Sequence, residues 1–133
     1  MRTGVWPICW TMLMSISAAP AGAICWVEEV RSHPDEVEVI FGSSFVHIIS
    51  SGGVQYSWYE RRLKRFSMTE STVLEGGLRL KLGDTAWLDN GGHHSRCELE
   101  VIEKDGKLAI RLKSSDQLPG MPAESAMQTV TAR

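Results

Sequence analysis

Apolar residues recur at every second position through much of this chain, and this period of two limits the possible folds more than any other feature. In the segments 78–82 and 110–113, leucine and isoleucine alternate with arginine and lysine. Successive side chains of a strand point to opposite faces, so this alternation predicts strands with one buried face. Similar alternation or short apolar runs occur at 25–28, 36–41, 45–49, 54–58 and 97–101. No stretch of ten or more residues carries a helical stripe.

Turn-forming residues separate these segments at short intervals. Glycine with serine, aspartate or asparagine occurs at 42–44, 51–53, 82–84, 90–92 and 105–106. Such residues supply the positive φ angles that tight hairpins need. Short strands joined by hairpins form small antiparallel barrels or sandwiches. We expect an all-β fold over residues 24–113, a small antiparallel β-barrel of about eight strands.

The first 23 residues have the layout of a secretory signal peptide. Arg2 is followed by an apolar stretch over 5–19, and small residues at 20–23 precede Ile24. A charged start, a short apolar middle and a small-residue cleavage site are typical of exported proteins. About 15 apolar residues fall short of the roughly 20 that span a bilayer. We expect a periplasmic or secreted protein with no stable transmembrane span after processing; the alternative is an uncleaved anchor.

The cysteines fit this compartment. Of three cysteines, Cys9 would leave with the signal peptide, and Cys25 and Cys97 would remain. An even number of cysteines in an oxidising compartment predicts one disulfide. Two free thiols, as in a cytosolic protein, are the alternative.

The last twenty residues, 114–133, have no sustained alternation. They include two prolines and several small polar residues. Such a composition is typical of a flexible tail, which we expect here. Residues 119–122 could instead form a short recognition segment.

The overall charge argues against nucleic acid as a partner. Fourteen Lys and Arg stand against sixteen Asp and Glu, so the formal net charge is −2. A polyanion needs a strong basic field, which this balance lacks. One basic cluster stands out, composed of Arg61, Arg62, Lys64 and Arg65. This cluster either contacts an anionic partner or is a charged edge strand that resists aggregation.

The sequence contains no recognisable catalytic motif, metal site or cofactor site. There is no G-x-S-x-G turn and no phosphate-binding glycine loop. His93 and His94 are adjacent, so on a strand they would point to opposite faces and make a poor chelating pair. Two or three of the four histidines could converge on zinc with Asp89 or Glu98, but solvated turn histidines are the default expectation. We expect a monomer or weak dimer that binds a protein partner and performs no chemistry. A small periplasmic hydrolase using His93 or His94 with Asp or Glu is the competing class.

Three tryptophans allow a further interpretation. Trp26, Trp58 and Trp87 lie in the predicted strand region. Aromatic side chains on a surface can bind carbohydrate, but in a small barrel they more often belong to the core or to an interface.

Two hairpin segments resemble the membrane-bound or periplasmic inhibitors of c-type lysozyme. Residues 80–91, LKLGDTAWLDNG, followed by Cys97, are similar to that family's late hairpin: an apolar strand, Lys-Gly-x-x-Ala, an apolar pair, an acidic-Gly turn and a closing cysteine. Residues 46–59, a strand, a Ser-Gly-Gly turn and a strand with Tyr56, are similar to an earlier hairpin. The resemblance implies a secreted barrel that blocks a cell-wall hydrolase through a surface loop.

In that family, a Ser-Gly-x-x-Tyr loop and the lysine of the late hairpin enter the lysozyme cleft, where their hydrogen bonds to carboxylates would be strong. Here Ser71 begins Ser-Thr-Val-Leu-Glu, which lacks the glycine and the tyrosine, and Leu82 stands at the lysine position with Lys81 one place earlier. The resemblance therefore implies contacts by Ser71 and Lys81. The turn 51–56 resembles the motif with one extra residue and is the alternative contact. A non-inhibitory envelope barrel with a structural or ligand-binding role is the alternative function.

Overall fold

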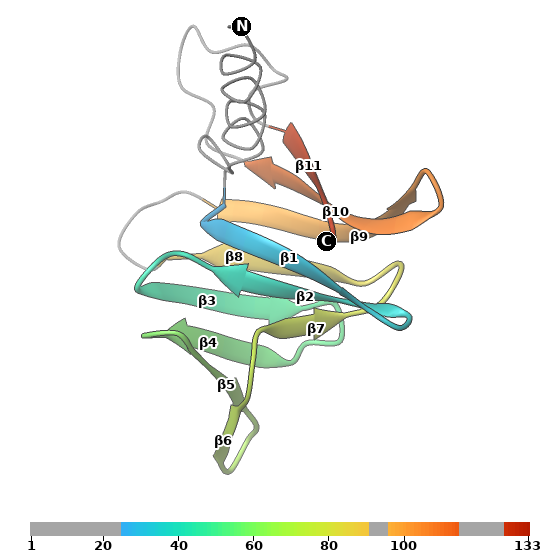
Figure 1. Cartoon of the computed structure of the whole chain (residues 1–133). Helices are drawn as coiled ribbons and strands as arrows, with labels where there is room; N and C mark the ends of the chain where they lie inside the picture. The colour runs from blue at the N-terminus through green and yellow to red at the C-terminus, as the bar shows by residue number, and fades with distance from the viewer. Residues whose placement is uncertain (1–24, 91–95, 115–126) are drawn as a thin grey trace, which may run out of the picture.

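The computed structural model describes residues 25–90, 96–114 and 127–133, and every regular element within them is a β-strand (Figure 1). The eleven strands are β1 (Val27–His33), β2 (Glu36–Phe41), β3 (Phe45–Ser50), β4 (Gln55–Tyr59), β5 (Arg62–Phe66), β6 (Ser71–Leu74), β7 (Leu78–Leu80), β8 (Thr85–Asp89), β9 (Arg96–Lys104), β10 (Lys107–Ser114) and β11 (Met127–Thr131). The all-β prediction is confirmed. No helix long and apolar enough to cross a membrane occurs in the described part of the chain.

The strands form two antiparallel sheets rather than the closed barrel that the sequence predicts. One sheet has the order β1-β2-β7, and the other has the order β11-β10-β9-β8-β3-β4-β5-β6. The backbone of Arg133 links their edges at one point: its N–H donates to Val30 O at 2.9 Å, and its carbonyl accepts from Ser32 N–H at 2.7 Å. The described strands therefore make two open sheets joined locally beside β1.

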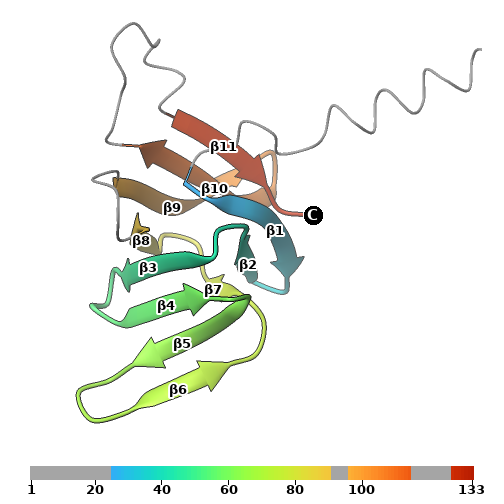
Figure 2. The ribbon, with the colours of Figure 1, turned by 90° about the vertical axis from the view of Figure 1, so that its left-hand side faces the viewer.

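The core lies between the two sheets. Figures 1 and 2 show the three-stranded sheet covering the middle of the larger one, while β5 and β6 extend beyond it. In β9 the pattern follows the predicted period of two, with Cys97, Leu99 and Val101 buried and their neighbours partly exposed. The largest buried side chains are Trp58, Phe41, Ile48, Leu63, Leu78, Leu88, Leu99, Ile110 and Leu112.

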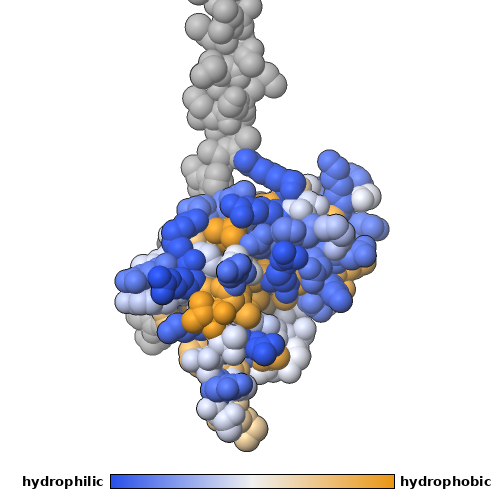
Figure 3. All heavy atoms as spheres, turned by 60° about the horizontal axis from the view of Figure 1, so that its bottom comes forward, coloured by the Kyte–Doolittle hydropathy of each residue, from blue (hydrophilic) through white to orange (hydrophobic). Residues whose placement is uncertain are grey.

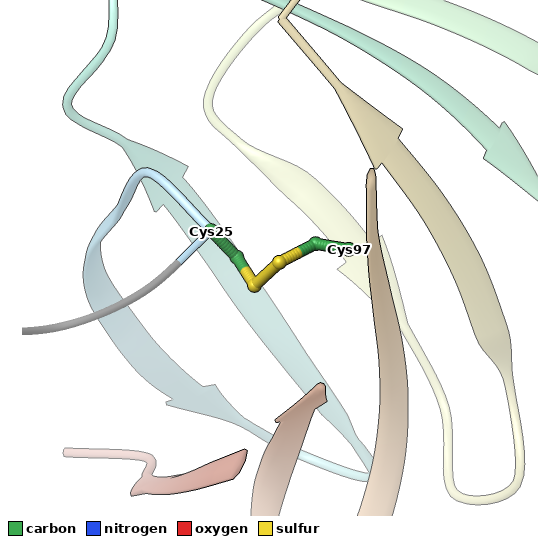
Figure 4. The surroundings of a disulfide bond; sticks show 2 residues. All are labelled: Cys25 and Cys97. Carbon is green, nitrogen blue, oxygen red and sulfur yellow. A yellow bond between two sulfur atoms is a disulfide. The ribbon is translucent and has the colours of Figure 1, made fainter. Parts of the chain in front are cut away.

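The predicted disulfide between Cys25 and Cys97 is confirmed (Figure 4). Their Cα atoms lie 5.7 Å apart, within the usual range for a disulfide. Both residues are buried. The bond ties the segment before β1 to the start of β9, and so joins the two sheets.

The chain end differs from the expected flexible tail. Residues 127–131 form β11, which pairs with β10 from Met127↔Lys113 to Thr131↔Ala109. In this strand Gln128 and Val130 are half-buried, whereas the residues between them are exposed. The predicted signal peptide, residues 1–23, and the rest of the predicted tail, residues 115–126, lie outside the described residues.

Two tight turns show how local sequence sets the hairpins. Asp105 and Gly106, a predicted turn, have φ angles of 54° and 79° between β9 and β10. Between β4 and β5, the two turn residues with positive φ are Glu60 and Arg61, at 50° and 65°. A turn with two positive φ angles favours Asn-Gly, so Glu60-Arg61 is an unfavourable pair for this position.

Replacing Glu60-Arg61 by Asn-Gly should therefore raise the free energy of unfolding by about 1 kcal/mol, because the new residues adopt positive φ at lower cost. Urea denaturation would measure the change. Arg61 Nη2 also lies 3.4 Å from Glu28 Oε2 in an exposed ion pair. Such a pair contributes little to stability. Glu28→Gln is the control for that contact, and an Asn-Gly variant less stable than wild type would contradict the expectation.

Candidate functional site

The described residues offer no obvious catalytic or metal centre. No group of three or more His, Cys, Asp or Glu side chains suited to a metal ion occurs among them. His33 contacts the buried Glu38, and His47 lies on the outer face of the large sheet. His93 and His94, assigned to the competing hydrolase, are outside the described residues.

The most exposed structural feature is the β5–β6 hairpin, defined here as residues 62–74. It pairs Leu63 with Leu74 at its base and Phe66 with Ser71 near its tip. No strand pairs with the other edge of β6 in the described sheets. In Figure 3 the hairpin is the narrow projection at the bottom, and hydrophobic residues gather above its base. It is thus well placed to enter a concave partner.

The tip of the hairpin is held by Ser67. Its backbone N–H donates to Glu70 O at 2.9 Å, and its hydroxyl donates to the same oxygen at 3.0 Å. Glu70 N–H lies 3.3 Å from the Ser67 hydroxyl oxygen. Met68, between them, is fully exposed. The turn therefore presents an apolar side chain on a well-bonded backbone.

Three cations of the basic cluster lie on β5. Arg62, Lys64 and Arg65 are exposed and have no ion-pair partner within the described residues, whereas Arg61 pairs weakly with Glu28. The cluster is not an edge strand, as one interpretation of the sequence had it, because β6 covers the outer edge of β5. These charges are therefore available to an anionic group.

The structure separates the two residues that the family resemblance selects. Ser71 begins β6 in the large sheet, whereas Lys81 follows β7, a strand of the small sheet. Lys81 lines a polar hollow with Asp35, Glu103 and Lys107, which Ser71 does not border. Leu82, at the family's lysine position, is exposed but borders that same hollow. Ser71 and Lys81 therefore do not form one site.

From the sequence, Ser71 and the turn 51–56 are alternative contacts for the partner. In the fold, these two segments are neighbours. Gln55 pairs with Phe66, and Phe66 pairs with Ser71, so the three residues form one row across β4, β5 and β6. Residues 52–55 and 65–68 line a shallow hollow of about 490 Å³ beside this row. Only non-local strand pairing brings these segments together, so no local motif could reveal their proximity.

A buried carboxylate anchors the chain where it leaves the hairpin. Glu38 accepts a hydrogen bond from Gly77 N–H at 2.7 Å, and its other oxygen lies 2.7 Å from His33 Nε2. Burial alone would raise the pKa of Glu38, but the bonds from Gly77 and His33 outweigh it, so this pKa is lower than the usual 4.5. Alternation predicts an outward-facing Glu38; instead, the segment Gly76–Gly77 covers it.

This lowered pKa predicts an acid-sensitive contribution to stability. A carboxyl whose folded-state pKa is depressed stabilises the protein above its unfolded pKa, and the stabilisation is lost as pH falls through the folded value. Unfolding midpoints in urea, measured from pH 6 down to pH 3, should fall more steeply for wild type than for Glu38→Gln. The exposed Glu70→Gln is the matched control and should follow wild type. Parallel curves for wild type and Glu38→Gln would contradict the assignment.

The site on the β5–β6 hairpin thus combines unpaired cations, a hydroxyl and exposed apolar groups on a projecting element, with a buried carboxylate behind it. No protein-family model matches the chain, and no curated protein or solved structure shows significant similarity to it.

Proposed function

We propose that this is an exported binding protein that blocks a cell-wall hydrolase, first of all a c-type lysozyme, by inserting the β5–β6 hairpin into the hydrolase cleft. The observation that carries the proposal is the projecting hairpin (Figure 2), whose β5 cations lack ion-pair partners among the described residues. Glycoside hydrolases use paired carboxyl groups flanking the scissile bond. A hairpin with free cations and a hydroxyl is chemically suited to such a cleft.

The register indicates which cation would act with Ser71. Lys64 pairs with Val73 and Phe66 pairs with Ser71, so these four side chains share one face of the hairpin. Lys64 and Ser71 are diagonal neighbours, at a separation that long side chains can bridge. An ammonium and a hydroxyl so placed can both donate to carboxylates, and charge-assisted bonds of this kind are strong in a desolvated cleft. In this proposal Lys64 takes the part that the resemblance gives to Lys81.

The test is to mix the purified protein with a c-type lysozyme and follow lysis of cell walls. We expect inhibition, a complex detectable by calorimetry, and weakening of both by added salt, since the attraction is between charges. Lys64→Ala and Ser71→Ala should each weaken inhibition, by about tenfold for Lys64. Lys81→Ala, the matched lysine on the other sheet, should inhibit like wild type.

Three outcomes would contradict the proposal. Unchanged lysis at a large molar excess of this protein over lysozyme, with no complex at low salt, would mean that the protein does not inhibit the hydrolase. Full potency of Lys64→Ala together with loss of potency in Lys81→Ala would move the contact away from the hairpin. Sedimentation with wall material without binding to the hydrolase would favour a structural envelope role instead.

Export is the second part of the proposal, and the buried disulfide supports it because such bonds persist in oxidising compartments. Cell fractionation should find the protein outside the cytoplasm, and its mass should correspond to a chain beginning at Ile24. Recovery of the full-length chain in the cytoplasm with both thiols reduced would contradict export.

A further inference from the structure

The outer face of the large sheet carries a second site, centred on Trp87. It lies on the same face as Phe66 and Ser71 of the hairpin, and Gln55 and Ile49 separate it from them along one row. This side chain is 48% exposed, although tryptophan is the largest apolar residue in the chain. Its cross-strand neighbour Ile49 is 37% exposed. Of the other two tryptophans in strand regions, Trp58 is buried and Trp26 is packed against the core. Burial therefore explains Trp58 and Trp26, whereas Trp87 is left without a packing role.

Strand register arranges the surroundings of Trp87 in two parallel rows. The first row runs Gln55, Ile49, Trp87, Glu98 across β4, β3, β8 and β9. The second row, two residues along each strand, runs Ser57, His47, Asp89, Arg96 across the same four strands. An apolar strip with polar ends thus lies beside a strip in which every residue can form hydrogen bonds.

A hollow of about 360 Å³ lies over the middle of these rows. It is lined by His47, Ile49, Trp87, Leu88, Asp89 and Arg96. This volume falls in the range of small-molecule sites, which combine apolar walls with a few placed polar groups. Protein interfaces need roughly 1,000 Å² or more and a core depleted of charge. Here charged residues adjoin Trp87, the one exposed tryptophan among the described residues.

We propose that this hollow binds a neutral oligosaccharide of pyranose sugars. One face of a pyranose ring presents C–H groups, which pack against the flat indole of Trp87, and the ring edge presents hydroxyls that both donate and accept hydrogen bonds. Asp89 and Arg96 already take part in contacts within the protein. A carboxylate has about four acceptor sites and a guanidinium has about five N–H donors, so each can also bond a sugar hydroxyl, and His47 can donate or accept according to its tautomer. In this proposal Trp87 packs against the face of the sugar ring, and the residues of the second row form hydrogen bonds with its hydroxyls.

The charge of the rows distinguishes this ligand from a nucleotide. A base could also stack on Trp87, but its phosphate would meet the carboxylates of Asp89 and Glu98. The cations opposite them, Arg96 and Lys113, are their cross-strand partners, so these four charges cancel and no net positive charge attracts a phosphate. Three strand spacings of about 4.8 Å separate Gln55 from Glu98, so the strip is about 14 Å long. A strip of that length suits several linked rings better than one.

The experiment titrates the purified protein with three neutral trisaccharides: tri-N-acetylchitotriose, cellotriose and maltotriose. Tryptophan fluorescence and calorimetry report binding. We expect at least one to bind with a Kd of about 1 mM or tighter. Trp87→Ala should weaken that binding at least about tenfold, which corresponds to about 1.4 kcal/mol. Asp89→Asn should weaken it less, because the amide retains one acceptor oxygen.

Tyr59→Ala is the matched control, since Tyr59 is an aromatic of the same sheet that is 52% exposed and does not line the hollow. It should bind like wild type, as should Lys64→Ala, whose effect on hydrolase inhibition is a separate matter. No binding of any trisaccharide at about 10 mM, or unchanged binding by a folded Trp87→Ala, would overturn the inference. So would loss of hydrolase inhibition in Trp87→Ala without glycan binding, which would make the face a protein contact.

Discussion

Replacing both Cys25 and Cys97 by alanine should lower the free energy of unfolding by roughly 4 kcal/mol. The bond joins residues separated by 72 positions, and the chain-entropy model assigns a loop of that size a cost of this order. Small domains are stable by about 5–15 kcal/mol, so this loss is a large part of the total. Both cysteines are buried, and alanine leaves no unsatisfied polar atom in their place.

Urea denaturation of the double variant measures this loss directly. Wild-type protein kept in reductant provides an independent comparison, because it loses the bond without changing a side chain. The two should unfold at similar urea concentrations, well below oxidised wild type. A difference from oxidised wild type of less than about 1 kcal/mol would show that the two sheets hold together without the covalent link.

The second large effect is expected at Gly77. A β-carbon there would collide with the carbonyl oxygen of Val39 and would lie 2.7 Å from Ile40 Cδ1. Because Val39 is backbone of the paired strand β2, relief requires the β2–β7 pairing to shift. That shift would also disturb the Gly77 N–H bond to the buried Glu38 carboxylate. Gly77→Ala should therefore cost about 3 kcal/mol or more.

Gly52→Ala is the matched control, because its β-carbon would meet no atom within 4 Å. Its stability should stay within about 0.5 kcal/mol of wild type. Thermal and urea unfolding of both variants would test the pair. A Gly77→Ala protein as stable as Gly52→Ala would mean that β7 does not pack against β2 as closely as described.

Features of this fold that depend on local sequence follow from the chain alone. Alternation of apolar residues predicts the inward faces of strands such as β9, because a strand's geometry places every second side chain on one face. Asp105-Gly106 predicts its hairpin because that dipeptide tolerates positive φ. The number and placement of cysteines predict the disulfide. Each of these inferences uses only neighbouring residues or a simple count.

Features that depend on which distant strands pair were decided by the tertiary structure. Strand pairing of β3 with β8 and of β2 with β7 produces two open sheets, where local patterns are equally compatible with a barrel. β6 is almost wholly exposed and β11 is half exposed, so neither has the apolar alternation that predicts a strand. Backbone hydrogen bonds to β5 and β10 stabilise them, and these bonds leave little trace in the side-chain pattern.

The candidate sites show the same division. Residue types indicated the basic cluster, the family resemblance indicated Ser71, and Trp87 was one of three tryptophans expected in the core or at an interface. The sequence could not say which of these residues would be neighbours. Register placed Lys64 diagonally beside Ser71 and aligned Trp87 with Ile49, whereas the pairing of β7 with β2 put Lys81, just after β7, beside the other sheet. A shift of one residue in any of these pairings would turn the side chains to the opposite face. Composition therefore determined which chemical groups this protein has, and the packing of its core against both sheets fixed the register that brings them together.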